Sequence, residues 1–256
     1  MHACLNVDEI LRLIASELVV SQGGATAVAL ACCCKSFEDP VLDTLWETQY
    51  QLFPLLESLP GDIWKDGKRG VSAPTTYVFS SLNYFIPKYF KRLPTTLECT
   101  RFRKYAQRMR SFKVPGDLKI LSSELFSVLQ LRTTGGLLLP NLKSLHLWYT
   151  NQEFIPFIKL FLSPQTTAIT IAFEFMGPGG LPPAAVASII TTFPTLCPNL
   201  REITLPNLPR DPRVVAAVSG MLSPPIEIPS DASLWILELH EGPLKWSTSY
   251  QTYTSS

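Results

Sequence analysis

Histidine is scarce in this chain, with three copies among 256 residues, at His2, His146 and His240. No His-x-x-x-His pair and no Gly-x-Ser-x-Gly segment is present, so the sequence lacks two common signatures of metal-dependent and serine-dependent hydrolases. The six cysteines contain no Cys-x-x-Cys hook, which argues against a structural zinc site. We therefore expect no enzyme activity, no metal site and no cofactor.

An excess of one charge is also missing. The chain has 22 basic and 21 acidic residues, for a net charge of +1, which argues against a general nucleic-acid or membrane-surface binder. Apolar runs are interrupted well before the roughly eighteen residues that a membrane span requires. The first residues show no basic and apolar stretch of the kind found in a secretory signal. We expect a cytoplasmic or nuclear protein whose cysteines are buried, small apolar side chains.

The first fifty residues contain three short helical patterns. Ile10, Ile14 and Leu18 recur at intervals of four, which predicts a helix with one apolar face. A second helix is expected from Thr26 onward, and a third from Pro40, with Asp39 as its N-cap. Because three short helices enclose only a small core, we interpret this stretch as a docking module that binds a partner.

The same stretch resembles an F-box, the helical motif that docks on the Skp adaptor of cullin-based ubiquitin ligases. Residues 7–11 match the family's opening Leu-Pro-x-Glu-Ile-Leu, residues 33–37 match its Val-Cys-Lys-x-Trp, and Leu45-Trp46 matches its late Leu-Trp. The segment 52–64 is similar to the continuation found in large F-box families of mushroom-forming fungi. The resemblance implies that docking, or the core of the module, is formed by Val7, Ile10, Leu11, Ile14, Cys34, Lys35 and Phe37.

Two positions depart from the family's pattern. Phe37 replaces a tryptophan and keeps an aromatic side chain. Asp8 replaces a proline that would fix the start of the first helix. This second departure leaves an alternative open, in which the protein is an interaction scaffold without ligase docking.

A basic helix is expected after Pro94. Phe102, Tyr105 and Ala106 share its apolar face, and basic residues dominate the other face between positions 88 and 113, where Glu98 is the one acid. One interpretation is recognition of an acidic or phosphorylated partner. The other is a solvated face balanced by acids elsewhere in the chain. The residues considered for substrate binding are Arg101, Arg103 and Lys104.

The pattern Leu-x-x-Leu-x-Leu occurs at 142–147, 200–205 and 234–239, with weaker copies at 109–114 and 166–171. Helical stretches are expected between the five copies, at 122–132, 152–162, 183–193 and 212–222. Strand-helix units that cannot bury their faces alone stack on their neighbours. We therefore predict irregular leucine-rich repeats that form an α/β solenoid with a parallel sheet.

These observations predict four regions: an F-box-like module at 1–50, a helical linker region at 51–108, the repeat array at 109–246 and a disordered tail at 247–256. The last strand, at 234–239, has no helix after it. We therefore expect a shortened version of a longer repeat protein, or a last strand that a partner covers.

The function that this resemblance implies is substrate recognition in a Skp-cullin-F-box ubiquitin ligase. The N-terminal module would dock on the Skp adaptor, and through it on a cullin scaffold, while the repeats would hold an unidentified protein substrate.

Overall fold

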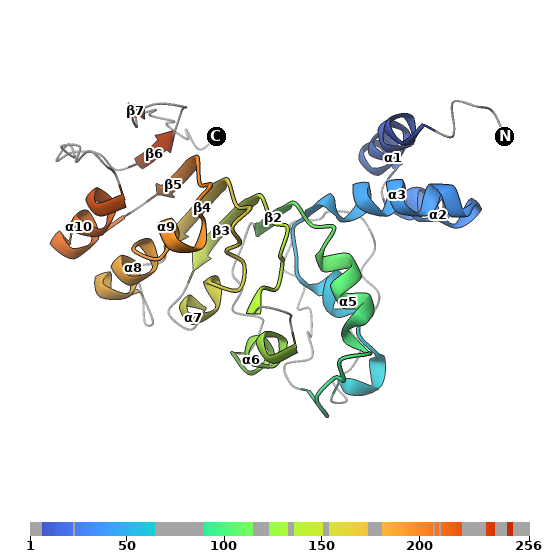
Figure 1. Cartoon of the computed structure of the whole chain (residues 1–256), viewed down its shortest axis with the longest axis horizontal. Coiled ribbons are helices and arrows are strands. Elements are labelled where there is room, and N and C mark those ends of the chain that lie inside the picture. The colour runs from blue at the N-terminus through green and yellow to red at the C-terminus, as the bar shows by residue number, and fades with distance from the viewer. Residues whose placement is uncertain are drawn as a thin grey trace, which may run out of the picture. The chain divides into compact units, whose positions relative to one another are not determined.

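A computed structural model of the chain describes residues 7–22, 24–64, 90–114, 123–132, 136–150, 154–173, 181–206, 208–209, 211–221, 234–238 and 245–247. The chain divides into two compact units, Met1–Arg110 and Ser111–Ser256 (Figure 1). His2, His240 and residues 248–256 lie outside the described residues. The tail expected to be disordered includes Ser247, which instead ends a short strand.

The first unit is mainly helical. Its helices pack in pairs, α1 against α2 and α3, α2 against α3, and α4 against α5. Five apolar side chains of the segment 52–64 are buried: Leu52, Leu55, Leu56, Leu59 and Ile63. The elements are α1 (Asp8–Gln22), α2 (Gly24–Cys33), α3 (Lys35–Glu47), β1 (Thr48–Gln49), α4 (Phe53–Leu56), the 3-10 turn η2 (Gly61–Ile63) and α5 (Cys99–Ala106).

The third helix begins earlier than the sequence predicted. We expected Pro40 at its first position, but α3 starts at Lys35 and contains Pro40 in its interior. Proline has no N–H to donate to the carbonyl of Ser36, so the helix forgoes one hydrogen bond there. Pro40 and Val41 are buried, and this burial offsets the missing bond.

The basic helix forms at the expected place and begins with a reciprocal cap. The backbone N–H of Thr95 donates to Glu98 Oε2 at 2.7 Å, and the N–H of Glu98 donates to Thr95 Oγ1 at 3.3 Å, the arrangement of a capping box. Hydrogen bonds from Arg92, and then from the Thr95 N–H, lower the pKa of the Glu98 carboxyl to about 2. Phe102 and Ala106 are buried on the apolar face, as predicted.

The second unit alternates strands and helices around one sheet. Figure 1 shows its helices on one side of the strands. Strands β2, β3, β4 and β5 pair in sequence order and run parallel. This architecture is mixed helix and strand and fits the α/β class. Its elements are β2 (Ser111–Val114), α6 (Ser123–Arg132), β3 (Ser144–Thr150), α7 (Ile155–Ile158), β4 (Ala168–Phe173), α8 (Pro183–Ile190), α9 (Phe193–Leu196), β5 (Glu202–Pro206), α10 (Pro212–Met221), β6 (Leu234–Glu238) and β7 (Lys245–Ser247).

The apolar positions of the sequence pattern lie beside one another across the sheet. Phe112 pairs with Leu145, Leu145 with Ile169, and Ile169 with Ile203. These four side chains are at most 2% exposed. Since alternate residues of a strand point to opposite faces, the same register places the residues between them on the other face of the sheet.

Buried hydroxyl groups tie the turn before β4 to the turn before β3. Ser163 Oγ and Thr166 Oγ1 each donate to the carbonyl of Leu142 at 3.1 Å, and both residues are fully buried. Asn199, in the Pro-Asn-Leu segment before β5, donates its side-chain N–H to the carbonyl of Pro164 at 2.8 Å. Each of these turns is therefore held by a side chain from the turn before the next strand.

Three expectations for the second unit need correction. The helix expected at 152–162 is the shorter α7, and residues 151–153 lie outside the described part. The helix expected at 183–193 ends at Ile190, and α9 starts at Phe193, because Pro194 disfavours continuation of the preceding turn. The strand at 234–238 pairs with β5 antiparallel, not parallel, and β7 pairs antiparallel with β6.

Helix α10 begins as the sequence predicted, with Asp211 as its cap and Pro212 at its first position. The Arg213 backbone N–H donates to Asp211 Oδ1 at 2.9 Å, and its guanidinium binds both carboxylate oxygens at the same distance. The Arg213 side chain, and then its N–H, lower the pKa of Asp211 to about 2.

This cap predicts a pH dependence. Because the pKa of Asp211 is lower in the folded chain than in the unfolded one, its contribution to stability is present above about pH 4 and is lost as the pH falls towards about 2. Asparagine keeps the cap but does not titrate. We therefore expect the melting temperatures of the native chain and of Asp211→Asn to converge over this range. A difference that stays constant with pH would contradict this origin of the stabilisation.

None of the described helices is long and apolar enough to cross a membrane. Among the described residues, no group of three histidine, cysteine or acidic side chains could hold a metal ion.

Candidate docking surface

Helix α1 begins at Asp8, the position where the F-box pattern has proline. The N–H of Leu11 donates to the carbonyl of Val7 at 3.1 Å, which closes the first turn. Asp8 and Glu9 place two carboxylates in this turn, where the helix dipole favours negative charge. Helix α1 therefore forms with two acidic residues in its first turn and without the proline of the F-box pattern.

The three helices enclose a small apolar core. Its buried members are Leu11 and Ala15 of α1, Ala27 of α2, and Phe37 and Val41 of α3. Leu18, which we expected on the apolar face of the first helix, is half-buried and packs against this core. Of the seven residues that match the family's motif, Leu11 and Phe37 therefore belong to the interior.

A second apolar stripe on α1 faces solvent. Its members are Val7, Ile10, Leu13 and Ile14, which are 43%, 38%, 67% and 36% exposed. Their spacing of three and four residues places them along one side of the helix, next to the side that carries Leu11 and Ala15. We call these four residues the α1 stripe. Leu13 was not predicted as a docking residue, although its spacing of three residues from Ile10 indicates the same side of the helix.

The remaining two matched residues lie where α2 passes into α3. Cys34 has extended backbone angles and precedes the first residue of α3. Its Sγ lies 2.9 Å from Ser36 Oγ, and this hydrogen bond lowers the pKa of the thiol. Lys35 is exposed. Cys34 also packs against the small core. Cys32 and Cys33, which we expected to be buried, are exposed near the end of α2.

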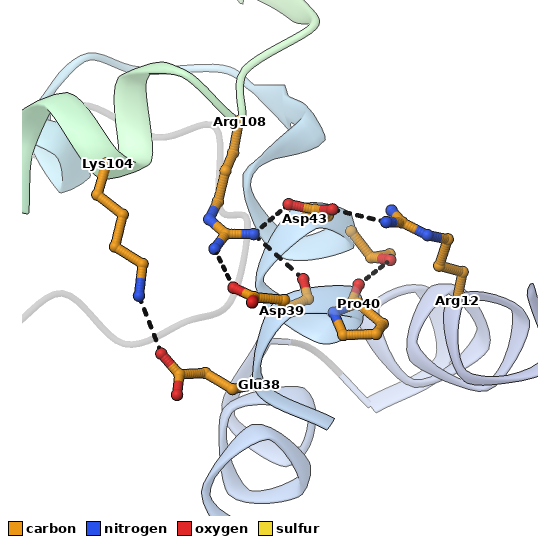
Figure 2. A network of polar contacts seen from close by, with 8 residues as sticks. Arg12, Glu38, Asp39, Pro40, Asp43, Lys104 and Arg108 are labelled. Atoms are coloured by element: carbon orange, nitrogen blue, oxygen red, sulfur yellow. Dashed lines mark hydrogen bonds and ion pairs between the residues drawn. The ribbon is translucent and has the colours of Figure 1, made fainter. Parts of the chain in front are cut away.

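An ion network joins α3 to α5 and α1. Figure 2 shows the Arg108 guanidinium between Asp39 and Asp43, and it binds both carboxylates. The guanidinium also donates to the Asp39 carbonyl at 3.2 Å, and Arg12 binds Asp43 from the other side at 2.6 Å. Burial works to lower the pKa of Arg108, but the two aspartates outweigh it and raise this pKa.

A ring contact supports the same junction of α3 and α5. The rings of Trp46 and Tyr105 stack with centroids 4.6 Å apart. With the Arg108 side chain only 12% exposed, charged hydrogen bonds and aromatic packing both hold α5 on α3. The three-helix module is thus fastened to α5 within one unit.

The basic residues considered for substrate binding have contacts inside the first unit. Lys104 binds Glu38 at 3.0 Å (Figure 2), and Arg103 donates to the carbonyls of Thr96 and Cys99 at 2.5 and 3.4 Å. Arg101 lies over the Tyr105 ring, 5.7 Å from its centroid, and is exposed. These contacts favour the interpretation of a solvated face balanced by acids.

Comparison with known proteins gives no further guide. No protein-family model, curated protein or solved structure matches the chain. Functional inference therefore rests on the residues themselves, above all on the α1 stripe.

A second surface lies on the sheet of the other unit. Ser144 and His146 point to the side opposite the buried Leu145 and Leu147, and Ser144 Oγ lies 2.7 Å from His146 Nε2. Burial, and then the charge of Lys113, lower the pKa of His146. A serine and a histidine on one strand form part of a catalytic arrangement, but among the described residues no acid orients this imidazole.

Proposed function

We propose that this protein is the substrate-recognition adaptor of a Skp-cullin-F-box ubiquitin ligase. The N-terminal helices α1 to α3 dock on the Skp adaptor, and the sheet of the second unit binds the protein to be ubiquitylated. The protein itself performs no chemistry in this function. Support comes from the F-box-like spacing of the sequence together with the surface that α1 presents.

The α1 stripe is the observation that carries the proposal. Side chains of isoleucine, leucine and valine each contribute about 1.5–3 kcal/mol when they move from water to a fully buried site. Four of them are at least 36% exposed on one side of α1, while the module's own core is complete without them. A partner with an apolar groove would bury this stripe in the manner of a helix in a groove.

The second unit supports the other half of the proposal. Its parallel strands alternate with helices, and the apolar residues of neighbouring strands pair in register. We interpret the strand-helix pairs as irregular leucine-rich repeats, in which each pair buries its apolar side against its neighbours. One face of the sheet is covered by helices (Figure 1), and we propose that the protein substrate binds on the other side.

Ile14→Asp tests the docking half. Ile14 is 36% exposed, so the chain should fold with aspartate there, whereas a docked partner would bury the new charge. We expect capture of a recombinant Skp adaptor to weaken by about 2 kcal/mol or more, which is roughly 30-fold in Kd. The measurement is titration of the full chain against the adaptor by calorimetry.

Leu97→Asp is the matched control, because Leu97 is an exposed leucine of the same unit, 82% accessible, outside α1. This control should bind like the native chain. Equal affinity for the native chain and Ile14→Asp would remove the stripe from the interface. If the native chain does not bind the adaptor, the proposed function is wrong, and the alternative, an interaction scaffold without ligase docking, takes its place.

A further inference from the structure

A single charged residue interrupts the apolar side of α1 that faces solvent. Glu17 follows Leu13 by four positions and Ile14 by three, so it lies on the same side of the helix as the α1 stripe. Val20, seven residues after Leu13, lies on this side too and is 82% exposed. Exposed apolar side chains therefore lie on α1 both before and after the Glu17 carboxylate.

No contact within the first unit explains this carboxylate. Glu17 is exposed, and it forms no ion pair with any residue in the described part of the chain. The residues three and four positions away along α1 are Leu13, Ile14, Val20 and Ser21, and none of them carries a positive charge that could pair with it on the helix surface. The fold of α1 therefore does not depend on the charge at this position.

Negative charge dominates the exposed surface of α1. Asp8 and Glu9 are exposed in its first turn, and Glu17 adds a third carboxylate. The one basic residue of this helix is Arg12, and its guanidinium binds Asp43 of α3 at 2.6 Å (Figure 2). A partner that covers α1 would therefore meet carboxylates that no cation of the helix balances, and a positively charged surface complements them.

A partner that buries the apolar residues must also accommodate Glu17. A groove that covers Leu13, Ile14 and Val20 takes water away from the carboxylate between them. Burial of a carboxylate without a partner is strongly unfavourable, whereas a charged hydrogen bond from lysine or arginine offsets the lost hydration. The residues of α1 therefore fit a groove that is apolar along most of its length and cationic opposite Glu17.

We infer that the docking groove of the adaptor carries a lysine or arginine side chain that binds the Glu17 carboxylate, and that Glu17 determines specificity for such a groove. This inference rests on the proposed function, because it names the chemistry of the partner surface that covers α1. A groove that is apolar throughout would leave the Glu17 charge unpaired, and the chain would discriminate against it.

Glu17→Leu separates a cationic groove from one that is apolar throughout. Leucine favours helix and continues the apolar side, so α1 should fold as before. Opposite a cation, leucine leaves the positive charge unpaired, and we expect the Kd of the full chain for a recombinant Skp adaptor to rise about 10-fold or more. In a groove without the cation, leucine would add buried apolar area and lower the Kd. Calorimetric titration measures both, with the melting temperature of each variant as the check on folding.

Glu17→Gln removes the charge and keeps the shape of the side chain, and it should raise the Kd about 5-fold or more. Glu57→Gln is the matched control, because Glu57 is an exposed glutamate of the same unit outside α1, and it should bind like the native chain. Native or tighter binding by either Glu17 variant would overturn the inference and leave the docking proposal intact. Absence of binding by the native chain would contradict the proposed function, and the inference with it.

Discussion

Phe161→Ala is expected to lower the free energy of unfolding of the second unit by about 3–5 kcal/mol, since the site cannot collapse around the lost ring. Phe161 is fully buried. Its ring centroid lies 5.5 Å from that of Phe112 on β2, 6.1 Å from that of Phe126 on α6 and 5.7 Å from that of Phe154. Removal of this one ring therefore opens a cavity between strand and helix.

Guanidinium unfolding, followed by circular dichroism, measures this loss. Leu131→Ala is the control, because Leu131 is 78% exposed near the end of α6, and its removal should change the free energy of unfolding by less than about 0.5 kcal/mol. A loss below about 1 kcal/mol for Phe161→Ala would show that the ring cluster does not hold the sheet and helices together.

Leu11→Asp is expected to unfold the three-helix module, at a cost of at least about 4 kcal/mol. Leu11 is 2% exposed and lies in the core formed with Ala27, Phe37 and Val41. Aspartate at this position loses the apolar burial and leaves a charge without a partner. Helical circular dichroism and the melting temperature should both fall, and adaptor capture should be lost with them.

Ile14→Asp, three residues further along the same helix, separates the two roles. It should keep the melting temperature within a few degrees of the native value while adaptor binding weakens. From sequence, Leu11→Asp and Ile14→Asp are equivalent tests of docking; the structure makes the first a test of folding. Retention of the native melting temperature by Leu11→Asp would show that the core assigned to this module is wrong.

Element boundaries could be predicted where the local chemistry is specific. Asp211 with Pro212 fixes the start of α10, and the sequence 94–96 marks the approach to α5, because caps and proline act within one turn. The direction of β6 could not be predicted. Alternating apolar residues define a strand and its faces but contain no information on whether it runs parallel or antiparallel to its neighbour.

The candidate site was only partly accessible to sequence reasoning. Periodicity shows that α1 has apolar residues on more than one side, but not which side the other helices cover. Ala15 is a small residue that the apolar pattern does not single out, yet it is fully buried beside Leu11. Because the side of α1 with Leu11 and Ala15 faces the other two helices, Ile10 and Ile14 remain exposed. The ionic partner of Lys104 could not be predicted either, because Glu38 lies 66 residues away in sequence.

The Arg108 network also sets an order of events during synthesis. Asp39 precedes the arginine that binds it by 69 residues, and ribosomes add about 5–20 residues per second. For roughly 3–14 seconds, therefore, the nascent three-helix module has two aspartates without their shared guanidinium and a Trp46 ring without its stacking partner. A chaperone that holds the nascent chain would meet this module with these apolar and acidic surfaces still exposed.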